Sequence, residues 1–206
     1  MSEESTLLLS TAYLAPVEYY LLMNRSSQVI IEQHDHYIKQ TYRNRCRIAS
    51  ANEVQILSIP IEKPDSPKCL TRDIRIAEHG NWRHLHWNGI LSAYNSTPFF
   101  EYYADDFRPF YEKQFRFLFD FNEQLRELIC SLINISPTVS YSENFLVDTN
   151  VSTLDGRDAI HPKKESLRKE FKPYYQVFES RFGFLPNLSI IDLLFNMGPE
   201  SIFYLK

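Results

Sequence analysis

Residues 7–32 decide the fold and read LLLSTAYLAPVEYYLLMNRSSQVIIE. The leucines at 7–9 predict a short buried strand, and Gln28–Glu32, with its Val-Ile-Ile centre, predicts a second. Between them, Pro16 stands where the first turn of a helix tolerates proline, and the apolar, aromatic segment Val17–Met23 continues that helix. Strand, helix and strand within about thirty residues is the spacing of a βαβ unit.

The alternation continues along the chain. Cys46–Ser50 and Val54–Ile59 flank a turn and predict a hairpin, followed by a proline-interrupted loop over 62–70. Asp73–Ile76, Thr138–Tyr141 and Tyr174–Phe178 predict further strands. A short helix is predicted around 157–160, and Ser189–Asn196 predicts a last helix with its first residue at the N-cap.

A helical block occupies about residues 82–135. Trp82, Leu85, His86, Ile90 and Tyr94 recur at helical spacing, and one long helix is predicted from Asp105 to Ile133. Strands alternating with helices predict a mixed α/β fold with a Rossmann-like sheet, into which this block is inserted or which it caps. We expect a single domain over 1–206.

Composition and charge exclude several classes of protein. The 206 residues carry a net charge of −4, so an even basic surface for nucleic acid is not expected. With five glycines there is neither a Walker loop nor a Gly-x-Gly-x-x-Gly run, and the sequence leaves any cofactor unknown. The three dispersed cysteines favour a reducing, cytoplasmic compartment. The acidic residues 1–6 argue against a signal peptide, and no apolar run is long enough for a membrane span.

The densest chemistry is the basic run at 39–45, Lys-Gln-Thr-Tyr-Arg-Asn-Arg. Lys39, Arg43 and Arg45 suit a phosphate or another anion, with Asn44 orienting the arginines. We expect these cations to point inward at a bound ligand. The alternative is a solvated hairpin whose cations pair with surface carboxylates such as Glu32 and Asp35.

Two His-x-His pairs, at 34–36 and 84–86, raise the question of a metal. The first pair could share one face of a strand, but the second lies in a predicted helix, where residues two apart diverge. We therefore predict no metal site. His86 is the best candidate general base, or else a histidine satisfied within the core.

The last helix carries Asp192 and Asn196 four residues apart on one face. A carboxylate among apolar residues is either catalytic or paired. The paired interpretation has Asp192 capping backbone groups or forming an ion pair with an arginine of the basic run. Tyr42, Trp82 and Asn196 are expected to support the pocket around these groups.

Three ordered blocks resemble the WbqC-like family. They are a Tyr-Leu-x-Pro segment leading to the Arg-Asn-Arg stretch and a Leu-x-x-Pro turn (residues 13–60), the Trp82 to Phe100 block, and the segment 188–198. Ser10-Thr11 stands where the family pattern has Gln-Pro. Family members occur in polysaccharide and O-antigen gene clusters, so the resemblance implies a sugar-modifying or sugar-transferring step.

These observations favour a transferase acting on a phosphorylated or nucleotide-linked sugar, with the basic run on the phosphates and His86 and Asp192 in catalysis. One alternative is a non-catalytic scaffold of a biosynthetic complex, which predicts a large exposed apolar patch and no enclosed pocket. Another is metal-assisted hydrolysis through His34 and His36.

Overall fold

The computed structural model describes residues 6–64, 66, 68–147 and 152–206. The first five residues, on which the argument against a signal peptide partly rests, lie outside this range. So do two positions of the 62–70 loop. No helix among the described residues is long and apolar enough to cross a membrane.

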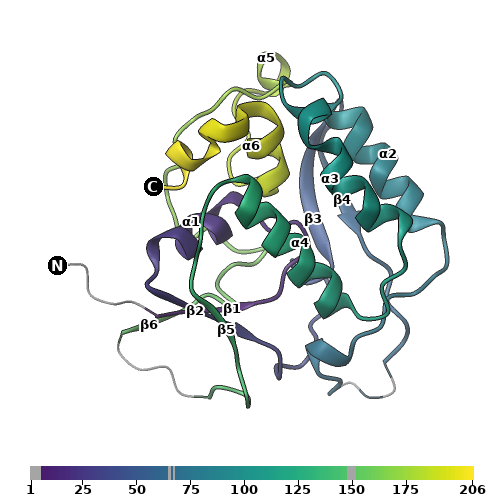
Figure 1. Cartoon of the computed structure of the whole chain (residues 1–206), viewed down its shortest axis with the longest axis vertical. Helices are drawn as coiled ribbons and strands as arrows, with labels where there is room; N and C mark the ends of the chain where they lie inside the picture. Colours follow the sequence, from purple (N-terminus) through teal and green to yellow (C-terminus); the bar gives the residue numbers. More distant parts are fainter. Residues whose placement is uncertain (1–5, 65, 67, 148–151) are drawn as a thin grey trace.

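A four-stranded parallel sheet forms one side of the molecule (Figure 1). Its order is β5-β2-β1-β6, with β1 Thr6–Ser10, β2 Gln28–Glu32, β5 Val139–Tyr141 and β6 Thr153–Asp155. The three leucines of β1 are fully buried because neighbouring strands flank it on both edges and side chains pack on both its faces. The βαβ prediction is confirmed, with α1 at Val17–Arg25.

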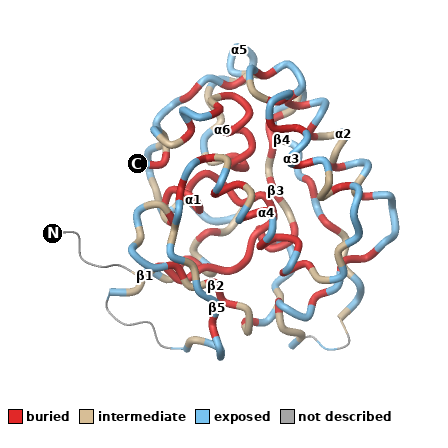
Figure 2. The backbone as a smooth tube through the Cα atoms, in the orientation of Figure 1, coloured by how far each residue is buried: buried red, intermediate tan, exposed pale blue. Residues whose placement is uncertain are grey.

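The antiparallel hairpin of β3 (Arg45–Ser50) and β4 (Glu53–Ser58) is confirmed as well. It stands apart from the parallel sheet, and α6 (Ile190–Met197) contacts both α1 and β3. Backbone bonds from Val17 to Leu188 and from Ile190 to Ala15 tie this last helix to the loop after β1. Figure 2 shows burial concentrated where α1, α6 and β3 meet.

The helical block lies between β2 and β5 in the chain, as predicted. It contains α2 (Trp82–Tyr94), α3 (Phe100–Glu112) and α4 (Leu118–Leu132). The single helix predicted over 105–133 was wrong. Residues 116–118 pair with 74–76 through Ile76 N–H to Arg116 and Leu118 N–H to Ile74, which draws the chain out of helical geometry between α3 and α4.

Other local predictions also fail. Asp73–Ile76 forms isolated bridges after a 3₁₀ turn at Thr71–Asp73, so it joins no ladder although its side chains alternate in burial. Tyr174–Phe178 forms no strand and ends in a turn before α5, and 157–160 is a turn. Leu85 of α2 is 60% exposed, whereas Trp82, His86, Ile90 and Tyr94 are buried as predicted. The short helices α5 (Glu179–Phe182) and η2 (Gly198–Tyr204) complete the chain.

Candidate functional site

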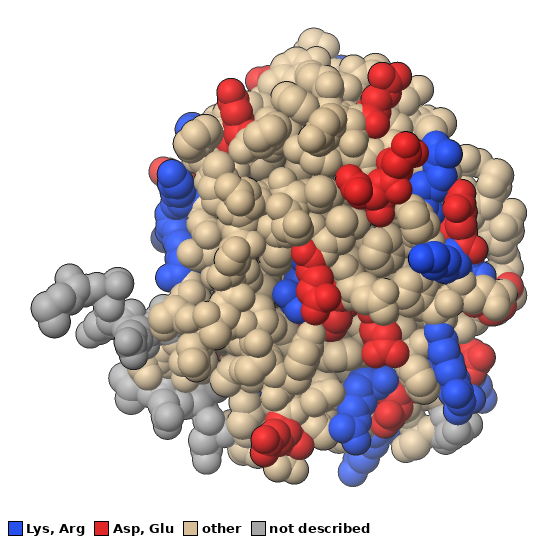
Figure 3. All heavy atoms as spheres, viewed as in Figure 1, with Lys and Arg blue, Asp and Glu red and all other residues tan. Residues whose placement is uncertain are grey.

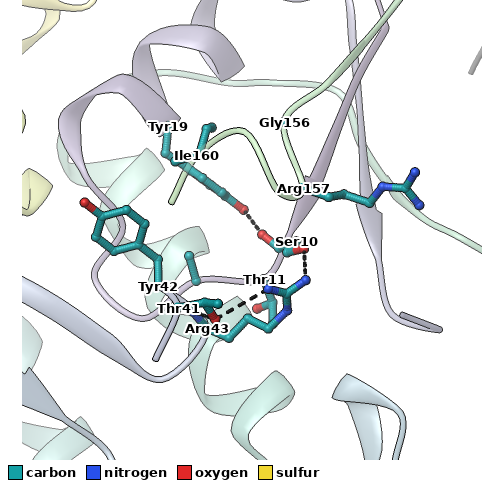
Figure 4. Close-up of a pocket in the computed structure, with 10 residues that line it drawn as sticks. Ser10, Thr11, Tyr19, Thr41, Tyr42, Arg43, Gly156, Arg157 and Ile160 are labelled. Atoms are coloured by element: carbon teal, nitrogen blue, oxygen red, sulfur yellow. Dashed lines mark hydrogen bonds between the residues drawn. The ribbon is translucent and has the colours of Figure 1, made fainter. Parts of the chain in front are cut away.

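The strand order creates a crevice beside β1. The chain passes from β1 to β2 and then to β5 on one side, whereas β6 pairs with the opposite edge of β1. The loops that follow β1 and β6 therefore lead away from each other. The place where the strand order reverses in this way is called the switch point, and open α/β sheets bind their ligands there, beside the carboxyl ends of the strands. A small cavity lies there (Figure 4). It is lined by Ser10, Thr11, Ala12, Tyr19, Thr41, Tyr42, Arg43, Gly156, Arg157 and Ile160.

Arg43 is the buried cation of this crevice. Its Nη2 donates to Ser10 Oγ over 2.7 Å and to the carboxylate of Asp35, and Ser10 Oγ also donates to Asp35 over 3.1 Å. Both ionic side chains are more than nine-tenths buried. Arg43 Nε and Asp35 Oδ1 have no partner among the described residues, so each retains capacity for a water or ligand atom.

A second arginine, Arg157, lines the same cavity as Arg43. Arg157, after β6, binds Asp155 and Glu32, whose carboxylate also accepts from Ser142 Oγ over 2.6 Å. Burial alone would raise the pKa of Asp155, but the hydrogen bonds and charge of Arg157 bring it below its usual value.

Thr11, the residue after Ser10, is also held by a carboxylate that pairs with an arginine. Thr11 Oγ1 donates to Glu123 over 2.8 Å, and Arg126 binds the other oxygen of that carboxylate over 2.7 Å. The end of β1 thus presents two hydroxyls in succession, each held by a carboxylate that an arginine neutralises. Such paired charges are already ordered before a ligand binds, so little free energy is lost in rearranging these side chains on binding.

A larger groove of about 850 Å³ adjoins the crevice at Tyr42, which lines both. Its volume lies within the range of small-molecule sites. Its cations are Arg47 of β3 and Lys164, Arg168 and Lys169 of the segment after β6. Burial raises the pKa of the Tyr42 hydroxyl, and the adjacent Arg47 guanidinium opposes part of that rise.

The segment 161–169, His-Pro-Lys-Lys-Glu-Ser-Leu-Arg-Lys, lines this groove and was not among the residues predicted for the site. It meets the predicted basic run, since Lys163 Nζ donates to Gln40 Oε1 over 2.9 Å. Partial burial and the charges of Lys164 and Lys163 lower the pKa of His161. The ring is therefore neutral at pH 7, and with Nδ1 accepting from the Lys163 N–H it carries its proton on Nε2.

Glu18 of α1 fastens this segment to the groove. Its carboxylate accepts from Ser166 Oγ, from the Leu167 N–H over 3.1 Å and from Asn187 Nδ2 over 2.9 Å. The side chain is 2% exposed. One buried carboxylate thus holds two walls of the groove together.

We predict that Glu18→Ala releases the 161–170 segment, because each hydrogen bond to a charged group contributes about 1.5–3 kcal/mol. Trypsin should cut at the basic residues of this segment at least about ten times faster, measured by mass spectrometry of timed digests. Glu101→Ala is the matched control, since Glu101 is likewise the second residue of its helix but is exposed. Equal cleavage of both variants would contradict the role of Glu18.

The basic run itself is divided by the fold. Lys39 is exposed, Arg43 is buried in the crevice, and Asn44 donates to the Ile59 carbonyl over 2.9 Å, which fastens the end of the hairpin. Arg45 is half-buried with its Nε unpartnered. Burial raises the pKa of Tyr37 to about 12 against the charges of Arg45 and Arg43, so both guanidinium groups lie near that hydroxyl.

His86 lies in the aromatic core. It is 5% exposed, its Nδ1 bonds the Tyr13 hydroxyl over 2.9 Å, and Trp82 packs edge-on against its ring. Burial lowers its pKa to about 4, while a bond to the Ser58 carbonyl acts in the opposite direction. These contacts correspond to the alternative of a satisfied core histidine, and its predicted role as a base stays a prediction.

Asp192 is buried at a second place in the core. Its Oδ2 accepts from the Tyr174 hydroxyl and from Gln176 Nε2, each over 2.7 Å. Asp192 forms no ion pair with an arginine of the basic run among the described residues, and its Oδ1 has no partner there. Asn196 turns back to the Asp192 carbonyl. The catalytic role predicted for Asp192 stays a prediction.

His86 and Asp192 do not meet in one site. Asp192 lies close to Tyr94, because burial raises the pKa of the Tyr94 hydroxyl and the charge of Asp192 raises it further. Tyr94 follows His86 by eight residues on α2, which corresponds to about 12 Å along the helix axis.

The first His-x-His pair is not arranged as a metal site. His36 is exposed, and Arg72 lies 3.5 Å from His34 Nε2, where its positive charge would repel a metal cation. Among the described residues no group of three or more histidine, cysteine or acidic side chains is arranged to hold a metal ion.

The fold and the crevice define an open α/β protein with a polar crevice at the switch point of a parallel sheet. Residues 11–160 match the family model described as the WbqC-like protein family, and the chain belongs to that family. The chain is 27% identical to the uncharacterized protein Rv1507c of Mycobacterium tuberculosis over 212 residues, covering 91% of each. No solved structure matches.

Proposed function

We propose that this protein binds a nucleotide-linked sugar in the groove and catalyses a group transfer onto that sugar during polysaccharide assembly. The observation that carries the proposal is the pairing of a charged crevice at the switch point with a groove large enough for such a ligand. Membership of the WbqC-like family supports the polysaccharide context.

Each part of the ligand has a complementary region. Phe171 and Phe184 line the groove and offer faces on which a base stacks. Arg47 and Lys164 form no ion pair among the described residues and supply charge for the two phosphates. His161 adds a neutral N–H donor beside them.

The sugar then lies toward the crevice, where Tyr42 joins the two spaces. The cavity there is about 10 Å³, room for one water or one small substituent. The reacting group meets the Ser10 hydroxyl, which Arg43 and Asp35 hold in place. In this proposal Arg43 positions Ser10, and Lys39 contributes only long-range attraction at the rim.

Isothermal titration with a panel of uridine, guanosine and thymidine diphosphate sugars tests the proposal. At least one should bind the wild type, and Arg47→Ala/Lys164→Ala should weaken it about tenfold or more, because each charged hydrogen bond contributes about 1.5–3 kcal/mol. Lys113→Ala, an exposed cation outside the groove, should bind normally. Absence of binding to the wild type, or equal affinity of the double variant, would reject the proposal.

The scaffold alternative predicts a large exposed apolar patch. Exposed large apolar side chains come from several elements, for example Ile56 on β4, Tyr102 on α3 and Phe203 near the C-terminus. On the face seen in Figure 3, most basic and acidic side chains lie toward the right, and much of the left and centre is uncharged. The groove of about 850 Å³ is the observation that favours a small-molecule site over a scaffold.

A further inference from the structure

A second cleft lies between α2 and α3 and shares no lining residue with the groove or the crevice. Its volume is about 250 Å³, just below the ~300–1,000 Å³ of most small-molecule pockets. It is lined by Asn81, Arg83, His84, Trp87, Arg108, Tyr111 and Glu112. Packing two helices together does not require an aromatic ring surrounded by polar side chains, so the cleft is a candidate for a binding site.

Trp87 forms the platform of this cleft. Its ring packs behind against Phe100 and Tyr111, with centroids 6.1 and 5.6 Å away, so its orientation is fixed by the core. The side chain is only partly buried. A half-exposed indole with a supported ring is suited to stack against a flat, weakly polar ligand face, such as the C–H face of a pyranose.

The polar rim carries two arginines and one glutamate, and Arg108 forms an ion pair of 3.8 Å with Asp105 that is weak because both groups are exposed. Arg83 is held in position by both oxygens of Glu78, and the Arg108 guanidinium lies 5.8 Å from the centre of the Trp87 ring. The first turn of α2 also begins here, and Asn81 makes no side-chain cap bond to it, so its N–H groups add positive potential. Glu112 supplies an acceptor for hydroxyl groups.

We propose that this cleft is a binding site for an acidic saccharide, a sugar ring bearing a carboxylate. The ring lies on Trp87, the carboxylate faces Arg108 and the start of α2, and the hydroxyls meet Arg83, Asn81 and Glu112. A planar guanidinium binds a carboxylate through two parallel hydrogen bonds, which a neutral sugar does not offer. The cleft and its ligand are separate from the proposed nucleotide–sugar site.

The chain offers an internal reporter, since its two tryptophans are Trp87 in the cleft and Trp82 in the core. Titration with a glucuronate-containing tetrasaccharide should shift the indole N–H signal of Trp87 in the NMR spectrum and leave that of Trp82 unchanged. A tetrasaccharide of glucose, which lacks the carboxylates, should bind at least about tenfold more weakly.

Arg108→Ala should reduce the affinity for the acidic tetrasaccharide about tenfold or more, since one charged hydrogen-bond pair is lost. Its matched control is Arg116→Ala, an exposed arginine over the ring of Phe117 outside the cleft. The inference is overturned if Trp87 does not respond, if both tryptophans respond alike, if glucose chains bind equally, or if the two variants bind equally. Unchanged nucleotide-sugar binding by Arg108→Ala separates this result from the proposed function.

Discussion

Arg43→Met should lower the free energy of unfolding by about 3–5 kcal/mol, the usual cost of leaving one partner of a buried ion pair without its counter-charge. Arg43 and Asp35 are both almost fully buried, and among the described residues only Ser10 also binds the carboxylate oxygen that Arg43 contacts. Without Arg43, Asp35 would lose its neutralising charge in a site with little access for water. Urea unfolding followed by circular dichroism measures the change.

The double variant Arg43→Met/Asp35→Asn should lose less than the sum of the two single changes, by about 2 kcal/mol or more, because both charges are then absent. The control is Arg75→Met. Arg75 and Glu62 form an ion pair of 3.9 Å at the surface, where such pairs contribute about 0–1 kcal/mol. Additive effects at Arg43 and Asp35, or a loss at Arg75 as large as at Arg43, would contradict the buried pair.

Asp192→Asn should gain stability relative to the wild type as the pH rises. Burial raises the pKa of Asp192 to about 6 from a usual value of 3.8, although hydrogen bonds from Tyr174 and Gln176 act in the opposite direction. The folded protein therefore binds more protons than the unfolded chain between these two values. In this window the contribution of Asp192 to stability is lost as the pH rises, and the loss is complete above about pH 6.

The shift of about two pKa units corresponds to about 3 kcal/mol between pH 4 and pH 7.5. Asparagine does not titrate, so any constant packing cost of the amide cancels when the two pH values are compared. Tyr174→Phe is the informative companion, because its hydroxyl lowers the pKa of Asp192 and its loss should steepen the dependence. A difference between wild type and Asp192→Asn that is the same at both pH values would refute the raised pKa.

Much of the fold follows from local pattern. The strand–helix–strand start, the hairpin, the first helix of the 82–135 block and the last helix are placed by period and by turn residues within about two positions. The errors at 73–76 and 105–133 share a cause. Residues 74–76 and 116–118 pair with each other, and this contact between segments forty residues apart overrides their separate propensities.

The site was only partly predictable. Arg43 of the basic run does line the crevice, and Asp35, the suggested counter-charge in the alternative interpretation, does pair with Arg43, but in the interior rather than at the surface. Ser10, Thr11 and Arg157 carried no local signal, because a hydroxyl after a strand becomes a site residue only when other strands end beside it. The charged segment 161–169 carried a signal in its composition, four basic side chains within seven positions, that the sequence analysis passed over.

Residue order determined which segments become strands and helices, since periodicity and turn chemistry act over a few neighbouring positions. Tertiary structure alone decided which polar groups share a space. The pairing of β6 with the free edge of β1 brings residues 10 and 157 together across nearly 150 positions, and the same folding sends His86 into an aromatic cluster. Strand order depends on the burial of apolar surface over the whole chain, which no short stretch encodes.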